Sequence, residues 1–158
     1  MSESCCSISY RPPATRSCPI SDSRSKPVAW STVAALAAGS VPRRQYFWLC
    51  EGSDCDVVYF GEEGTLLGTS DVRVIPSFKG SPSQNDLVCY CFLYRRQDIE
   101  DELKASGDTT IFDRITAEVK AENCACEVRN PSGQCCLGDV RKAIKESREK
   151  LRIRKIPS

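Results

Sequence analysis

The sequence predicts an α+β protein, because two kinds of hydrophobic pattern occupy different parts of the chain. Aromatic and β-branched runs at residues 45–50 and 56–60 flank a short polar loop, as is typical of a β-hairpin. From residue 95 onward, apolar residues recur every three or four positions, which indicates amphipathic helices. The third observation concerns chemistry. Six of the 11 cysteines lie between residues 89 and 136, around one turn and one helix start.

Composition limits the class of protein. The chain has 158 residues, 27% of them charged and 41% hydrophobic, so it forms one or two domains with a modest core. The net charge of +1 creates no field that would attract nucleic acid or a membrane, and we expect neither as a partner. Histidine is absent, which excludes Cys-His and Ser-His nucleophilic sites and mixed Cys/His zinc fingers. A site for a soft metal must therefore be built from thiolates.

The N-terminal sequence predicts a cytoplasmic protein. It has no apolar h-region or cleavage signature, and the longest apolar stretch, residues 33–38, is too short to span a membrane. In the cytoplasm thiols stay reduced, so many cysteines favour metal binding over disulfides. Residues 1–26 are rich in Ser, Pro and Arg and predict a mostly disordered start, in which the adjacent Cys5 and Cys6 are expected to be unliganded.

The first ordered segment is expected to be a helix that Ser31 caps and Gly39 ends. Residues 71–76 predict a third short strand, and residues 77–86 have the composition of a linker. Between these elements, the hairpin turn carries Cys50 and Cys55. Two thiols on a tight loop between strands form half of a zinc-knuckle-like site.

The second half predicts three helices. Residues 95–105 carry a narrow apolar stripe and end at Ser106-Gly107, and residues 109–122 follow, capped by Asp108 or Thr109. The last helix covers about residues 137–152, with Val140, Ile144 and Leu151 on one face. Residues 141–155 hold eight Lys or Arg against two Glu. This basic face is either simply solvated or a dock for an acidic partner.

The six thiols of the second half favour a [2Fe–2S] cluster over zinc. Such a cluster needs four thiolates from separated segments, and Cys89 and Cys91 supply one side. The turn Asn130–Gly133 is expected to turn backbone N–H groups toward the anionic cluster. The helix that begins after Cys136 would stabilise the same negative charge with its N-terminus.

Two further ligands come from four remaining thiols: Cys124, Cys126, Cys135 and Cys136. Neighbouring side chains at a helix start diverge by about 100°, so we expect one ligand from the last pair and prefer Cys136. Cys126 lies nearer the turn than Cys124 and is preferred there. The spare thiols either pack in the core or capture a soft metal ion transiently.

Three segments resemble a known family. They read "CDVVYFGEEGT", "VCYCF" and "CACEVRNPSGQCCLGDV". They are similar to the N-terminal region of CopZ-type copper chaperones, which carry a zinc site and a [2Fe–2S] cluster, and the resemblance covers about residues 17–142. The layout of the cluster half is also similar to bacterioferritin-associated ferredoxin.

This resemblance implies a small zinc-binding subdomain, with a β-hairpin and one helix, packed on a helical [2Fe–2S] subdomain. The implied order is a disordered lead at 1–16, a zinc-type subdomain at 17–80, a cluster subdomain at 87–140 and a basic helical extension at 141–158. It implies cluster ligands at Cys89, Cys91, Cys126 and Cys136, and zinc ligands at Cys18, Cys50 and Cys55. The function implied is electron transfer tied to copper handling, including reduction of Cu(II) to Cu(I), with a copper-handling protein as partner.

The sequence departs from the family pattern at two points. Ser21 stands where the resemblance implies a thiolate, and a hydroxyl is a poor zinc ligand, so Asp22, Cys5, Cys6 or water would have to complete the site. The sequence also contains no Met-x-Cys-x-x-Cys copper-binding motif. Two rival interpretations remain: an interaction protein with purely structural metals, and a cysteine-rich soft-metal scavenger. The sequence contains no nucleotide-binding loop and no paired acid/base site that would predict a conventional enzyme.

Overall fold

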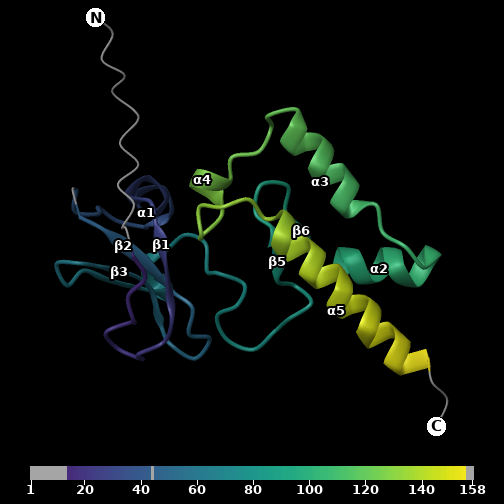
Figure 1. The fold of residues 1–158 in the computed structure, drawn as a ribbon, viewed down its shortest axis with the longest axis horizontal. Helices are drawn as coiled ribbons and strands as arrows, with labels where there is room; N and C mark the ends of the chain where they lie inside the picture. The colour runs from purple at the N-terminus through teal and green to yellow at the C-terminus, as the bar shows by residue number, and fades with distance from the viewer. Residues whose placement is uncertain (1–13, 44, 156–158) are drawn as a thin grey trace, which may run out of the picture.

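The computed structural model describes residues 14–43 and 45–155, with side chains up to residue 152 (Figure 1). Cys5 and Cys6 therefore lie outside the described residues. The fold is α+β, with a four-stranded antiparallel sheet on one side and most of the helices, with a two-stranded sheet among them, on the other. We call residues 14–80 the sheet half and residues 87–155 the helical half. No helix in the described part of the chain is long and apolar enough to cross a membrane.

The sheet half is built on the predicted hairpin. Four antiparallel strands lie in the order β1-β2-β3-β4. They are β1 (Ser25–Val28), β2 (Phe47–Cys50), β3 (Val57–Gly61) and β4 (Leu66–Gly68). The central strands β2 and β3 are buried throughout. Their pairing places Leu49 opposite Tyr59 and confirms the hairpin.

The two faces of this sheet bury different side chains. Along β2, Phe47 and Leu49 pack toward helix α1 (Trp30–Leu36), while Trp48 and Cys50 point to the other face, as the two-residue period of a strand requires. On that second face the rings of Trp48 and Phe60 stack at 5.6 Å between centroids. The cysteines of the sheet half lie in this second cluster.

Two expectations for the sheet half are wrong, and one strand was not predicted. Residues 71–76 form no strand: Asp71 ends the short 3-10 helix η1 (Thr69–Asp71), and Val72 makes an isolated bridge to Ala37. Strand β1, which the sequence did not predict, contains Pro27, and it occupies the sheet edge, where a missing N–H is tolerated. Helix α1 begins at Trp30 after the uncapped Ala29 and ends before Ala37, because the chain there turns to pair with Val72.

The helical half contains a two-stranded sheet and four helices. They are β5 (Leu87–Cys89), β6 (Tyr94–Arg95), α2 (Arg96–Ser106), α3 (Ile111–Lys120), α4 (Cys126–Arg129) and α5 (Leu137–Lys155). The predicted apolar stripes are buried in one cluster that includes Ile99, Leu103, Ile111, Ile115 and Val140. Gly107 ends α2 in the left-handed conformation, as expected, whereas α3 begins after Thr110 rather than after Asp108 or Thr109.

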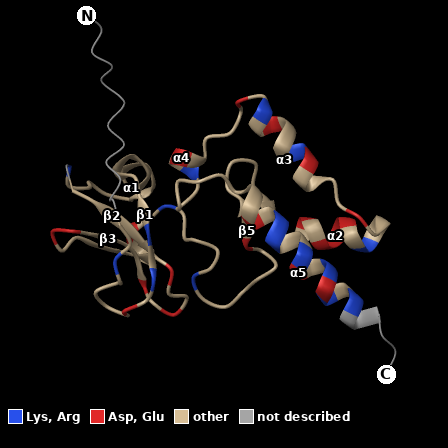
Figure 2. Cartoon of the chain, viewed as in Figure 1, with Lys and Arg blue, Asp and Glu red and all other residues tan. Residues whose placement is uncertain are grey.

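Several basic residues of helix α5 form ion pairs or ring contacts with other parts of the same chain. Lys150 pairs with the buried Glu100 of α2 at 2.7 Å, and Arg148 pairs with Asp108 at 2.6 Å. The guanidinium of Arg141 lies 4.7 Å from the centre of the Phe112 ring. Blue and red residues alternate along α5 in Figure 2. These pairings reduce the charge that remains for an acidic partner.

The predicted linker, residues 77–86, contains no helix or strand. It is nevertheless held against the sheet half. The ammonium group of Lys79 donates hydrogen bonds to three backbone carbonyls, those of Gly52, Cys55 and Val57, at 2.7–3.1 Å. One side chain of the linker thus closes the loop between β2 and β3.

Candidate metal sites

The first site consists of the thiols of Cys18, Cys50 and Cys55. All three are buried, and their sulfur atoms lie within 4.8 Å of one another. Cys50 is the last residue of β2, and Cys55 follows in the loop before β3. Cys18 reaches them because β1 pairs with β2, with Ser25 opposite Cys50, and the chain before β1 turns back tightly. The structure thus brings together the three residues that the resemblance implied for zinc.

Ser21 lies beside these thiols. Its hydroxyl oxygen is 3.8 Å from the Cys50 sulfur and donates a hydrogen bond to the hydroxyl of Ser23 at 2.9 Å. Asp22, one of the alternative fourth ligands, is exposed and is not in the described group of donor atoms. The group beside the three sulfurs at the fourth position of a tetrahedral site is therefore a hydroxyl, which zinc rarely uses as a ligand.

The surroundings shift the pKa of two of the three thiols in opposite directions. Burial raises the pKa of Cys18, but hydrogen bonds from the Ser21 side chain, the Ser21 and Ile20 backbones and Cys50 together lower it to about 7. The pKa of Cys50 is raised, mainly by burial. A metal ion must displace the remaining protons, because cysteine binds zinc only in its thiolate form.

The second site consists of two pairs of thiols that join distant segments. The sulfur atoms of Cys91 and Cys126 lie 3.4 Å apart although 35 residues separate them. The thiols of Cys89 and Cys136 lie close enough for each to shift the pKa of the other. Cys89 ends β5, Cys126 begins α4, and Cys136 immediately precedes α5. The structure thus pairs all four thiols that the sequence preferred as cluster ligands.

Backbone N–H groups lie near three of these sulfurs. Ala125 donates to the Cys91 sulfur at 3.3 Å, and the backbone of Cys136 and the backbones of Phe92 and Cys91 act to lower the pKa of Cys126 and of Cys89 respectively. Such donors stabilise negative charge on sulfur. α5 begins one residue after Cys136, so its N-terminus also faces this site, as predicted.

The source of these N–H groups differs from the prediction. The turn Asn130–Gly133 exists, since Gly133 N–H donates to the Asn130 carbonyl at 2.8 Å. However, Ser132 N–H donates to the Asn130 side chain and Gln134 N–H donates to the Ser132 hydroxyl. The turn uses these groups internally, because Asn and Ser side chains compete for nearby backbone donors. The expectation that they face the cluster is wrong.

The surroundings shift the pKa of three of these thiols, those of Cys89, Cys126 and Cys136. The hydrogen bond from Cys136 is the main cause that lowers the pKa of Cys89 to about 6, and the pKa of Cys136 is correspondingly raised. Burial, together with Cys91, raises the pKa of Cys126 to about 12. One thiol of a close pair thus supports the other as a thiolate, and a cation would be needed to ionise all four.

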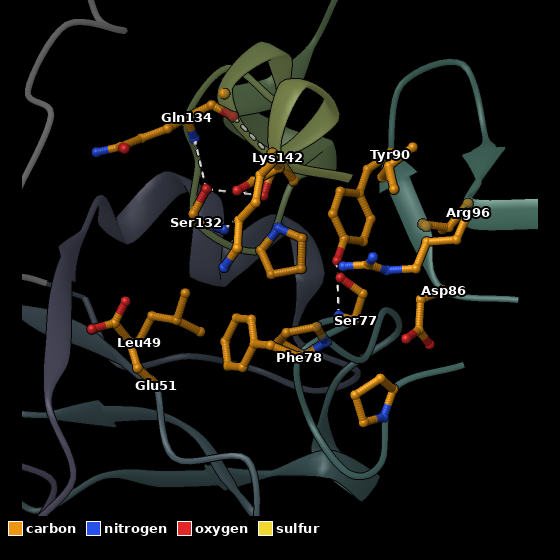
Figure 3. Close-up of a pocket in the computed structure, with 18 of the residues that line it drawn as sticks. Leu49, Glu51, Ser77, Phe78, Asp86, Tyr90, Arg96, Ser132, Gln134 and Lys142 are labelled. Atoms are coloured by element: carbon orange, nitrogen blue, oxygen red, sulfur yellow. Dashed lines mark hydrogen bonds between the residues drawn. The ribbon is translucent and has the colours of Figure 1, made fainter. Parts of the chain in front are cut away.

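The two spare thiols are not buried, whereas three of the four paired thiols are, and Cys91 is half-buried like Cys124. Cys136 is 2% exposed, whereas its neighbour Cys135 is exposed, as expected if their side chains diverge. Cys124 is half-buried. Cys135 lines a cavity of about 740 Å³ between the two halves, where Tyr90, Lys142 and Ser132 are also found (Figure 3). Charges of both signs line this cavity, and Arg96 pairs there with Glu146 at 2.8 Å.

The first comparison concerns the class of domain. Residues 15–73 match a family model, zf_CopZ, described as a zinc binding domain. This segment contains all three thiols of the first site. A three-thiol site in such a region supports zinc as its metal and metal handling as the role of the region.

The second comparison is with a particular solved structure. The X-ray structure of the Archaeoglobus fulgidus CopZ N-terminal domain matches with a TM-score of 0.62 at 22% identity, over 80% of this chain and 96% of that chain. At this identity the likeness shows a shared fold. No curated protein matches the chain. The two findings together support a CopZ-type region.

Sequence reasoning missed Lys79 and Ala125. Lys79 lies in the linker and has no neighbouring motif, and only the folded chain shows that it holds the loop between Cys50 and Cys55. Ala125 contributes its backbone N–H, a group that every residue except proline carries. Neither role leaves a signal in the sequence.

Proposed function

We propose that this chain is a cytoplasmic [2Fe–2S] protein that acts as an electron-transfer and metal-handling accessory for copper or another soft metal. The observation that carries the proposal is the pairing of Cys91 with Cys126 and of Cys89 with Cys136. Four thiols in two close pairs, with N–H donors aimed at the sulfurs, fit the two-iron cluster, in which each iron takes two thiolates. Cys89, Cys91, Cys126 and Cys136 would hold it.

The first site would hold zinc through Cys18, Cys50 and Cys55. In this arrangement residues 17–80 would be the zinc subdomain and residues 87–140 the cluster subdomain. Residues 141–158 would be a basic helical extension of the cluster subdomain. The separate hydrophobic clusters of the two halves support this division. Structural zinc adds directly to folding free energy, so its role would be to stabilise the sheet half.

A bound [2Fe–2S] centre supplies one-electron transfer, which suits the reduction of Cu(II) to Cu(I) with one electron from an external donor protein. The protein's own residues exclude water from three of the four thiols by burying them and hold negative charge with the N–H groups of Ala125 and Cys136. The proposed partners are a copper-handling protein or an acidic protein surface that binds the basic face of α5.

The test is anaerobic purification after expression with ample iron and sulfide. We expect red-brown protein with two irons and two labile sulfides, and an EPR signal that appears on reduction and disappears on reoxidation. Colourless protein that holds zinc alone would contradict the cluster. A cluster that cannot be reduced at a physiological potential would instead favour an interaction protein with structural metals.

The exposed Cys135 and half-buried Cys124 favour one second candidate, a soft-metal scavenger. Titration of cluster-loaded protein with Cu(I) separates the two functions. A scavenger binds Cu(I) tightly beyond the cluster and loses that capacity in a Cys124→Ser/Cys135→Ser variant. An electron-transfer protein keeps its reversible reduction in the same variant.

A further inference from the structure

The loop between two of the proposed cluster ligands, Cys126 and Cys136, is internally rigid. Its centre is the turn Asn130–Gly133, closed by the Gly133-to-Asn130 hydrogen bond. The Asn130 side chain accepts from Ser132 and donates to the Gln134 carbonyl at 2.9 Å. A turn with this many internal bonds moves as a unit, so whatever holds it also positions the cysteines at its two ends.

This loop is held by the sheet half. The Tyr59 hydroxyl donates a hydrogen bond to the Pro131 carbonyl at 2.7 Å, and Tyr59 is 0% exposed. Burial is the main cause that raises the pKa of Tyr59, so the phenol stays protonated and can donate. Gly133 has φ +68° and packs so closely on α1 that a Cβ there would lie 2.6 Å from the Thr32 hydroxyl oxygen. The loop thus fits against both β3 and α1.

Tyr59 is also tied to the three-thiol site. It lies on β3, which begins two residues after Cys55, and it pairs across the sheet with Leu49, the residue before Cys50. Lys79 joins the carbonyls of Cys55 and Val57, so the thiol loop and the start of β3 are held together. A short path from Cys50 to Leu49 and across the sheet to Tyr59, buried at each of these residues, therefore connects the three-thiol site to the Tyr59 hydroxyl.

Resting on the function proposed above, we propose that Tyr59 is a positioning residue that couples the two metal sites through its hydrogen bond to Pro131. Metal at Cys18, Cys50 and Cys55 orders the ends of β2 and β3 and thereby fixes Tyr59 against the ligand loop. By thermodynamic reciprocity, a cluster held by that loop raises the zinc affinity of the three-thiol site by the same factor.

The test uses the full-length protein and measures the zinc dissociation constant by chelator competition, with and without the reconstituted cluster. Typical coupling factors run from about 5 to 150, so we expect the cluster-loaded wild type to bind zinc at least about fivefold more tightly. Tyr59→Phe removes one hydroxyl and should bring the ratio close to one. Tyr46→Phe is the control for loss of a tyrosine hydroxyl on the opposite face of the sheet. Tyr46 packs against the cluster that holds Trp48 and the three thiols, so this variant can change zinc affinity in both states but should keep the wild-type ratio.

A second pair of variants perturbs the ligand loop from the side of α1. Gly133→Ala places a methyl group against Thr32 and strains the backbone at φ +68°, so it should also lower the ratio. Thr32→Ala added to it removes the clashing oxygen but not the backbone strain, so it should restore part of the coupling. Equal ratios in wild type and Tyr59→Phe, or a wild-type ratio of one, overturn the proposal.

If wild type forms no cluster, the proposed function fails but the coupling is still measurable. Zinc added to cluster-free protein should then slow amide hydrogen exchange at Ser132 and Gly133 in wild type but not in Tyr59→Phe. Unchanged exchange in wild type overturns the coupling by itself.

Discussion

The sheet half and the helical half gather their thiols in different ways. In the sheet half, two of the three thiols sit at the ends of neighbouring strands, and the pairing of β1 with β2 delivers the third. In the helical half, each thiol pair joins segments more than thirty residues apart, and the pairs meet only when α5 packs on α2 and β5. The sheet site therefore depends on local pairing, and the helical site depends on long-range packing.

This difference predicts separate behaviour under mutation. A lesion in the helical half should leave the sheet site intact, because its three thiols need none of the helices. Two described hydrogen bonds join the halves near the sites: the Tyr59 hydroxyl donates to the Pro131 carbonyl, and the Ser77 N–H donates to the Tyr90 hydroxyl at 2.9 Å. The predictions below separate the halves, in order of decreasing expected effect.

The largest effect is expected from Cys89→Ser or Cys91→Ser. Each variant removes one thiolate from a pair, and a two-iron cluster has no spare ligand to replace it. The visible absorption of the cluster should be lost or its lifetime severely shortened, while the sheet half still binds zinc, more weakly by the factor of the proposed coupling. Complete loss of zinc in these variants would contradict the local assembly of the sheet site.

The next effect distinguishes true ligands from neighbours. Cys126→Ser and Cys136→Ser should behave like Cys89→Ser, whereas Cys124→Ser and Cys135→Ser should keep the cluster absorption, because the first two thiols are buried and paired. The two neighbours are matched controls, with the same substitution one or two positions away. Loss of colour in Cys124→Ser alone would reverse the assignment at that end of the loop.

A smaller effect is expected from Ser21→Cys in the sheet half. The hydroxyl lies 3.8 Å from the Cys50 sulfur, so a thiol at this position can close the site as a fourth ligand. Zinc affinity should rise by at least about tenfold, or about 1.4 kcal/mol, and the melting temperature of the sheet half should rise with it. The cluster spectrum should not change. Ser23→Cys is a control that places a thiol on the same turn, and an equal gain there would mean that any added thiol suffices.

If wild type already retains zinc as well as Ser21→Cys against a chelator, the fourth ligand comes from elsewhere in the chain. Substitutions of Cys5, Cys6 and Asp22 would then identify it.

The smallest effect concerns the packing of α5 on α2. Glu100 is buried and accepts from Lys150, and Glu100→Gln should lower the free energy of unfolding by about 1–2 kcal/mol. Burial raises the pKa of Glu100, but Lys150 and Lys104 outweigh it and lower the pKa below the ordinary 4.5. The stabilisation is therefore complete above about pH 4.5 and is lost as pH falls through the lowered native value. Urea unfolding at pH 7 and pH 3 should show a large difference between wild type and variant only at pH 7.

The sequence by itself determined the elements with strong periodicity. The hairpin at Phe47–Cys50 and Val57–Gly61, the stripes on α2 and α3 and the helix after Cys136 follow from patterns that local physics enforces. The sequence also predicted that the side chains of Cys135 and Cys136 diverge at the helix start, and the structure buries Cys136 while it exposes Cys135.

Only the tertiary structure decided what the local patterns leave open. β1 contains a proline and lacks alternation, and it becomes a strand because the edge of β2 offers it hydrogen-bond partners. The N–H groups of the turn Asn130–Gly133 form hydrogen bonds within the turn, so the N–H groups near the sulfurs are those of Ala125 and Cys136 instead. The contact of Tyr59 with Pro131 joins residues 72 positions apart. Such a contact depends on how two independently patterned halves pack together, and no local sequence signal records that packing.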